Sequence, residues 1–326
     1  MDQQVDQFKI PENVVAYSHI NNPERALVIG AGFGGLAVAI RLALKGYEVQ
    51  ILERLGSAGG RAYVHRRHGF TFDAGPTIIT APFLLEELWE MCGKKMSDDV
   101  DLRAMDPFYQ IRFSDGRVFN YTGDLERMKD EVAKFSPKDL PGYLRFLEEA
   151  ESCYKLAFED LGDVAFDSVG DLVKAMPNLI KMRAWKSLYS VVAKYIKDPQ
   201  LREVMSFHPL LIGGNPFSVS SAYALINSLE RKWGVHSAMG GTGSIIKGMV
   251  GLLNGLGVSI RYASTVKKIN IVDNKVTGVT LENGDVLYAN KVVSNADTAW
   301  TYKNLIDPEY RKVWTDKKIE NGKYSM

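Results

Sequence analysis

The sequence predicts a protein of the α/β class, and three features of its first 61 residues predict it. An apolar run at Ala26–Ile29 has the composition of a buried strand and leads into the glycine-rich turn Gly30–Gly35. A helix is predicted over Leu36–Lys45, and a second apolar strand, Val49–Leu52, ends at Glu53. A strand, a glycine turn, a helix, a strand and an acid in this order predict a Rossmann-like dinucleotide-binding fold.

Each glycine of the turn has a separate physical task. Gly30 allows the tight turn, Gly32 lets the backbone approach a pyrophosphate, and Gly35 lets the helix pack closely on the strand. The amino end of the helix then faces the phosphates with free N–H groups and a partial positive charge. Glu53 is expected to accept hydrogen bonds from ribose hydroxyls and to repel a 2′-phosphate.

Composition limits the possible partners. The chain has 326 residues, 46% of them hydrophobic, and a net charge of +1, which indicates a sizeable core and no nucleic acid as partner. Cys92 and Cys153 form no C-x-x-C pair, and the five histidines show no ligand spacing, so we predict no metal site and a reducing cytoplasm. Residues 1–22 are polar and resemble no signal peptide, and no apolar run is long enough to span a bilayer.

The rest of the chain mixes strands and helices. The sequence predicts a hairpin with an Asp-Gly turn over residues 108–121, a mostly helical stretch over 123–207 and further helices over 218–231 and 240–256. Within the helical stretch, breaks are expected at Pro137, Gly162, Pro177 and Pro199. Strands are predicted near Tyr63 and over 70–72, 266–272, 276–281, 286–288 and 291–294.

This order of elements predicts a discontinuous organisation, with nucleotide-binding segments on both sides of an insertion. The expected parts are a flexible extension (1–24), a dinucleotide-binding domain (25–100 and 232–300), a substrate and membrane-associated domain (101–231) and a tail (301–326).

Several stretches together resemble the bacterial phytoene desaturase family of carotenoid biosynthesis. The similarity runs from about Arg25 to about Pro308, nearly the whole chain. The matching stretches are Val28–Ala37, Gly59–Val64, Gly69–Thr77, Phe207-His208, Gly213–Phe217, Glu230–Val235, Gly240–Gly243 and Val293–Asp297.

The resemblance implies a fold and a chemistry. The fold would be an FAD-binding Rossmann-like domain of the glutathione-reductase type, like that of amine oxidases, interleaved with a mixed α+β substrate domain. The reaction would be desaturation of phytoene or a related acyclic precursor, with hydride passing from a substrate carbon to flavin N5 and a proton being lost. The partners would be a long apolar polyene and membrane lipids, and the protein would be peripheral to the inner face of the cell membrane.

The resemblance also implies the residues that hold the cofactor. Gly30, Gly32 and Gly35 would hold the pyrophosphate, Glu53 the adenosine ribose, and the Gly60-Arg61 turn would lie near the pyrophosphate and the ribityl chain. The remaining implied positions are Gly75, Pro76 and Thr77 near the flavin ring, Val266 with backbone groups for the adenine, and Asp297 close to the cofactor.

Candidates for proton transfer lie in the helical stretch. Asp171 and Lys174 are three residues apart on a predicted helix, hence on one face, where relatives tend to carry Asp and Arg. The alternative is a helix-start acid beside a surface lysine. His208 is a third candidate, either near the substrate or structural.

A basic segment in the same stretch is a candidate membrane contact. Residues 174–197 carry six cations and no acid, mixed with apolar residues and Trp185. Such a segment suits anionic lipid headgroups, and the alternative is a solvated charged face.

Members of the family continue well past residue 326 and carry a second glycine- and proline-rich FAD motif there. This chain therefore looks like a C-terminally truncated member. The alternatives are a carotenoid isomerase, a ketolase or an amine oxidase on the same scaffold, or a non-catalytic remnant.

Overall fold

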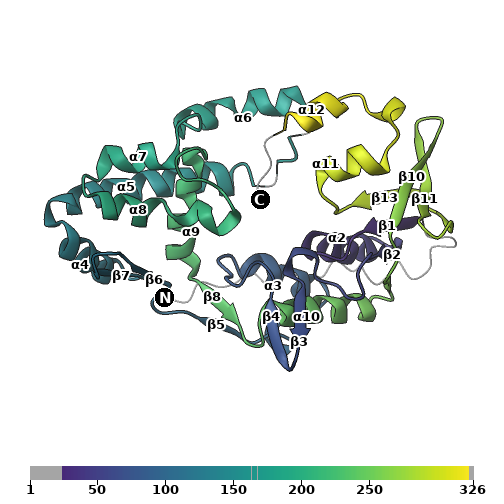
Figure 1. The fold of residues 1–326 in the computed structure, drawn as a ribbon, viewed down its shortest axis with the longest axis horizontal. Coiled ribbons are helices and arrows are strands. Elements are labelled where there is room, and N and C mark those ends of the chain that lie inside the picture. Colours follow the sequence, from purple (N-terminus) through teal and green to yellow (C-terminus); the bar gives the residue numbers. More distant parts are fainter. Residues whose placement is uncertain (1–23, 163, 167, 323–326) are drawn as a thin grey trace. The chain divides into compact units, whose positions relative to one another are not determined.

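The computed structural model describes residues 24–162, 164–166 and 168–322 (Figure 1). The chain folds into two compact units. Unit 1 comprises residues 24–77, 83–103 and 237–322, and unit 2 comprises the described residues of 78–82 and 104–236. All but the last residue of the extension predicted over 1–24 lies outside the described residues.

Two of the boundaries between the units lie close to short strands. The chain passes between the units at 103/104 and 236/237, near strands β5 (Leu102–Ala104) and β8 (His236–Ala238). Residues 78–82 belong to unit 2, although the residues on both sides of them belong to unit 1. Residues 301–322 are grouped with unit 1. The functions assigned to the two parts stay predictions.

A parallel sheet is the centre of unit 1. Its strands are β1 (Arg25–Ile29), β2 (Glu48–Leu52), β9 (Ser259–Arg261) and β13 (Lys291–Ser294), in the order β13-β1-β2-β9. Four of the five β1 residues are buried, which explains their continuous apolar run. The chain continues from β1 to β2 on one side, and β13 pairs with β1 on the other. The carboxyl ends of β1 and β13 therefore meet at a topological switch point.

Two helices pack together beside this sheet. They are α2 (Phe33–Leu44) and α10 (Thr242–Gly255). A Cβ on Gly35 would overlap the carbonyl oxygen of Gly30, so only glycine allows α2 to lie this close to the loop. α3 (Phe83–Met91) is fixed by its buried Trp89, whose indole N–H donates to Asp99 at 2.8 Å.

An antiparallel sheet shares an apolar core with the parallel one. Its strands are β10 (Val266–Val272), β11 (Lys275–Leu281) and β12 (Val286–Tyr288). Asp273 and Asn274 both have positive φ, at 50° and 58°, which is the conformation of a type I′ hairpin turn and confirms the turn predicted there. The remaining helices and strands of unit 1 are β3 (Val64–Arg67), β4 (Phe70–Asp73), α11 (Thr298–Trp300) and α12 (Asp316–Glu320).

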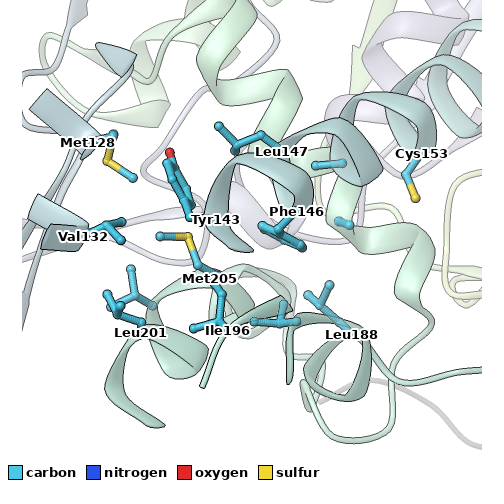
Figure 2. Packing of buried hydrophobic residues seen from close by; sticks show 14 of the residues in the cluster. Met128, Val132, Tyr143, Phe146, Leu147, Cys153, Leu188, Ile196, Leu201 and Met205 are labelled. Carbon is cyan, nitrogen blue, oxygen red and sulfur yellow. The ribbon is translucent and has the colours of Figure 1, made fainter. Parts of the chain in front are cut away.

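Unit 2 is helical apart from one hairpin. The hairpin, β6 (Tyr109–Arg112) and β7 (Val118–Tyr121), confirms the prediction. The helices are α4 (Leu125–Phe135), α5 (Leu140–Tyr154), α6 (Val169–Lys181), α7 (Leu188–Tyr195), α8 (Pro199–Ser206) and α9 (Leu225–Trp233). Figure 2 shows their core, in which Tyr143 and Phe146 of α5 face Met205 and Ile196.

Two details of the helical prediction were wrong. Pro177 does not break a helix but lies inside α6. Proline has no N–H, so Pro177 cannot donate to the carbonyl of Val173. This carbonyl lies on an exposed turn, where water can supply the missing hydrogen bond. The helix predicted over 218–231 begins as a 3-10 turn, Ser221–Ala224, and becomes α-helical at Leu225. By contrast, Pro137 and Pro199 each start a helical segment, where the missing N–H has no helical partner to lose.

Candidate functional site

The glycine loop of unit 1 is tied to its neighbours through backbone hydrogen bonds. Gly30, at φ 93°, donates its N–H to Leu52 O at 2.8 Å, and Gly59 donates to Ala31 O at 2.8 Å. Helix α2 then begins at Phe33. Among the described residues no side chain caps it, and its first turn has no acid. Its amino end therefore offers unpaired N–H groups and a positive dipole end to an anion.

Glu53 lies where the sequence predicts it, at the carboxyl end of β2. The side chain is only 4% exposed. Its Oε2 accepts from Ala31 N at 2.7 Å and its Oε1 from Leu55 N at 2.8 Å. Each carboxylate oxygen can accept a further bond, so Glu53 both fixes the loop and remains able to accept from a ribose hydroxyl.

Tyr262 is a neighbour of Glu53 that the sequence did not reveal. Burial, and then the nearby Glu53 carboxylate, raise the pKa of its phenol above the usual value. Val266 is in the same region: it is the first residue of β10, and Ser264, two residues earlier, donates its N–H to Glu53 O at 2.8 Å. The predicted adenine and ribose positions therefore share one stretch of unit 1.

The Gly59–Arg61 turn lies directly against the glycine loop. Gly32 and Gly59 form a parallel bridge, and Gly60 faces the Cα of Gly32. The Arg61 side chain is 88% exposed, and its Nη2 lies 3.7 Å from Oδ2 of Asp297. Two residues predicted from separate motifs are thus brought together. Asp297 also caps α11 by accepting from Trp300 N at 3.1 Å.

The Gly75-Pro76-Thr77 turn is held against this arrangement. Gly75 has φ 108°, and a Cβ there would overlap the carbonyl oxygen of Arg61. Thr242, at the start of α10, donates its hydroxyl to Pro76 O. Asp73 packs against Gly241, and its Oδ1 is buried without a hydrogen-bond partner in the described part of the chain. The sequence reasoning missed both Asp73 and Thr242.

Asn295 is a further residue of this site that was missed. It directly follows β13 and donates its backbone N–H to Ile29 O at 2.8 Å, which places it at the switch point beside the glycine loop. Its side chain lies over Gly32 and Gly34. The motif Val293–Asp297 contains both residues, but the sequence pattern predicts a site role for Asp297 alone.

The catalytic candidates lie in unit 2 and form two separate groups. Lys174 Nζ is 3.8 Å from Asp171 Oδ1, and the Ser168 hydroxyl accepts from Asp171 N as the cap of α6. His208 is fully buried, and its Nε2 lies 3.1 Å from Oε2 of Glu230.

Tyrosine side chains complete the group around His208. The Tyr109 hydroxyl donates to Glu230 Oε1 at 2.7 Å. Burial, and then the Glu230 charge, raise the pKa values of Tyr109 and Tyr121, so both remain neutral donors. The Tyr121 hydroxyl donates to Asn227 Oδ1 at 2.9 Å. The group arranged in this way is a buried polar cluster rather than an open site.

The hydrogen-bond donors and acceptors of unit 1 can be compared with those that a flavin dinucleotide requires. The capless amino end of α2 suits a pyrophosphate, and the buried carboxylate at the end of the adjacent strand suits a ribose. The residues present therefore fit the adenosine diphosphate half of a dinucleotide.

The relatives of this chain include several phytoene desaturases and a carotenoid oxygenase. The chain is 44% identical to the lycopene-forming phytoene desaturase of Pantoea ananas over 91% of its own length and 61% of the relative's. It is 43% identical to the neurosporene-forming enzyme of Cereibacter sphaeroides, over 95% of the chain and 60% of that protein. The 4,4′-diapolycopene oxygenase of Methylomonas is 32% identical over 88% of the chain and 58% of that protein. The chain thus spans about 60% of the length of these relatives.

Solved structures share the fold. An oxidoreductase from Methanosarcina mazei superposes with a TM-score of 0.65 at 20% identity, over 91% of this chain and 65% of that one. Putrescine oxidase with bound putrescine gives a TM-score of 0.59 at 16% identity, over 88% and 61%. The profile of the flavin containing amine oxidoreductases matches residues 33–325. With this match over most of its length, the chain belongs to the flavin containing amine oxidoreductase family.

Proposed function

We propose that the protein is an FAD-dependent desaturase of phytoene or a related acyclic carotenoid precursor. The observation that carries this is the 44% identity to a lycopene-forming phytoene desaturase over 91% of the chain. The glycine loop and the Glu53 carboxylate bound to it support the proposal. Bound FAD would accept the hydride that leaves a substrate carbon.

The residues of unit 1 would bind and orient the cofactor. The amino end of α2, with Gly30, Gly32 and Gly35, would hold the pyrophosphate, and Glu53 the ribose. The exposed Arg61 side chain would neutralise phosphate charge. The proposed positions beyond these are Gly60 beside the pyrophosphate, Gly75, Pro76 and Thr77 near the ring, Val266 at the adenine and Asp297 as the partner of Arg61.

For the proton that must leave, Asp171, Lys174 and His208 remain proposals. Asp171 and Lys174 are supported by their ion pair on one face of α6. His208 is supported only as a buried group within a hydrogen-bonded cluster. A pH profile of turnover for Asp171→Asn and Lys174→Met would test the first pair: a proton-transfer role predicts a displaced profile, and an unchanged profile contradicts it.

Two experiments test the main proposal. The purified protein, supplied with FAD, should acquire flavin absorbance, and expression in phytoene-accumulating cells should convert phytoene to coloured products. A protein that FAD cannot reconstitute would support a non-catalytic remnant instead.

A second candidate function has one observation in its favour. The similarity to a diapolycopene oxygenase suggests oxygenation of a carotenoid on the same scaffold, as a ketolase would perform. Pigment analysis separates the two, because desaturation lengthens the polyene whereas a ketolase adds carbonyl oxygen. Release of peroxide from amines would instead indicate an amine oxidase.

We also propose that unit 2 attaches the protein to the inner face of the cell membrane through α6. Ala175 is the only buried residue of this helix. Its apolar residues Val169, Val173 and Ile180 are 80%, 63% and 54% exposed, and Trp185 beyond it is 67% exposed. An apolar face bordered by cations suits an anionic bilayer surface. Within the described residues, no helix is long and apolar enough to cross a membrane.

Charge reversal tests the attachment. Lys181 and Lys186 are exposed, whereas Arg183 lies 3.8 Å from Glu149, so its reversal would also disturb the fold. Lys181→Glu with Lys186→Glu should reduce sedimentation with liposomes that contain anionic lipid. Unchanged co-sedimentation would reject the role of these cations.

A further inference from the structure

We propose that the side-chain amide of Asn295 is a direct ligand of the cofactor pyrophosphate, donating Nδ2–H to a phosphate oxygen. This inference rests on the proposed binding of FAD in unit 1. It adds a side-chain contact to a phosphate site that the glycine fingerprint describes through backbone alone.

The Asn295 side-chain amide lies beside the loop glycines Gly32 and Gly34. A Cβ atom added in ideal geometry to each loop glycine shows which neighbouring atoms that glycine faces. A Cβ on Gly32 would lie 3.1 Å from Asn295 Nδ2, and one on Gly34 would lie 2.5 Å from Asn295 Oδ1. The Asn295 amide thus lies across the first turn of α2. No side chain caps the backbone N–H groups of that turn.

The position of Asn295 explains Gly34, a glycine that the dinucleotide-binding fingerprint does not require. Gly30, Gly32 and Gly35 are its three positions, whereas Gly34 lies between them in the first turn of a helix. A helical glycine is ordinarily less stable than alanine by about 1 kcal/mol. The space beside Gly34 is filled by the Asn295 amide, so a side chain at 34 would displace it.

The Asn295 amide has the chemistry of a phosphate donor. In the described part of the chain, the Asn295 side chain makes no hydrogen bond of its own, although its backbone is fixed to β1. An asparagine amide presents both a donor and an acceptor, and rotation about χ2 exchanges them. It is therefore able to turn its NH₂ group toward a phosphate oxygen beside the helix end.

The charge around the loop points the same way. Arg61, on the turn beside the loop, lies 3.7 Å from the Asp297 carboxylate, which neutralises part of the charge of the arginine. The neutral amide of Asn295 can donate a hydrogen bond to a phosphate without adding a negative charge that would repel it. An aspartate there would keep the shape but would place a carboxylate beside the phosphates.

The experiment measures equilibrium binding of FAD, ADP and adenosine to the full chain and to Asn295→Asp and Asn295→Ala. We expect the dissociation constants for FAD and ADP to rise about tenfold or more in Asn295→Asp and a few-fold in Asn295→Ala, because a hydrogen bond to a charged group is lost. Binding of adenosine, which has no phosphate, should change little.

A matched control adds the same charge elsewhere in unit 1. Asn254 is exposed near the end of α10. That helix leads into β9, so its end lies at the opposite edge of the parallel sheet from the loop. Asn254→Asp should leave all three dissociation constants unchanged.

The outcomes separate this inference from the proposed function. A chain that binds neither FAD nor ADP overturns both. A chain that binds FAD while Asn295→Asp binds it equally well, or loses adenosine to the same degree, overturns only the role of Asn295.

A second measurement tests the geometry without a ligand. Gly34→Ala should lower thermal stability in the presence of Asn295 and raise it in the Asn295→Ala background, where the space is free. The same sign in both backgrounds would show that the amide does not occupy this space and would overturn the proposal.

Discussion

The glycine loop of unit 1 and the buried polar cluster of unit 2 are built in opposite ways. The loop offers backbone N–H groups from one continuous stretch, Gly32–Gly35, where helix α2 begins. The cluster joins side chains from distant stretches, with Glu230 accepting from Tyr109, 121 residues away, and lying 3.1 Å from His208. A site made of backbone depends on spacing and can be read from sequence, whereas one made of side chains depends on tertiary contacts.

The two regions also differ in what they leave unsatisfied. The amino end of α2 keeps free donors at an accessible edge, as a binding site requires. In the cluster both carboxylate oxygens of Glu230 have partners, and the unpaired atom among the described residues there, Nδ1 of His208, is buried rather than open to a ligand. We therefore expect mutations in the cluster to change stability and mutations at the loop to change binding.

The largest effect is expected for Glu230→Ala. It would leave Tyr109 and His208 buried without their acceptor, and the free energy of unfolding should fall by about 3 kcal/mol. Urea unfolding measures it. Glu230→Gln, which keeps one acceptor oxygen, should lose less. Equal, small losses in both variants would show that the cluster does not stabilise the fold.

Gly35→Ala should follow, because its Cβ would overlap the Gly30 carbonyl oxygen. Overpacking of this kind costs about 2 kcal/mol of unfolding free energy and should also weaken FAD binding. The matched control is Gly251→Ala in α10, where no atom lies within 4 Å of the added Cβ. That variant should be as stable as the wild type or more so, and a similar loss in both would contradict the steric argument.

Glu53→Gln should weaken FAD binding about tenfold with a smaller effect on folding. The glutamine NH₂ group would face the N–H of Ala31 or Leu55 and could not accept from it. The charged acceptor proposed for the ribose would also be lost. Isothermal titration with FAD measures the change. Glu48→Gln, at the exposed start of the same strand, is the control. Equal affinity of Glu53→Gln and the wild type for FAD would show that the Glu53 carboxylate does not bind the cofactor.

The smallest effect is expected at the exposed turn of the β6–β7 hairpin. Hydrogen bonds from the Arg117 backbone, and then from Gln200 and the Arg117 side chain, lower the pKa of Asp115 to about 2. Because the folded pKa lies below the unfolded value of 3.8, its contribution to stability is present above about pH 4 and is lost as the pH falls toward 2.

Comparison of melting temperatures tests this. Asp115→Asn should melt slightly below the wild type near neutral pH, and the difference should shrink between about pH 4 and about pH 2. A difference that stays constant over this range would rule out the carboxylate charge as its cause.

Much of unit 1 could be predicted because its signals are local. The strand, loop, helix and second strand at 25–52 follow one another in sequence, and Glu53 takes its place from the end of β2. The hairpins at Asp115-Gly116 and Asp273-Asn274 were readable for the same reason, since turn residues fix their own backbone. Pro177 was misread because local propensity predicts a break, whereas α6 continues through an exposed turn.

The sequence by itself determined the dinucleotide loop, the acid that follows it and most helices and strands, because these depend on residues within a few positions of one another. Only the tertiary structure decided which distant residues meet there. It paired Arg61 with Asp297, placed Asn295 over Gly34 and buried His208 against Glu230. Parallel strands bring together segments more than 200 residues apart, and no local spacing records which side chains then come into contact.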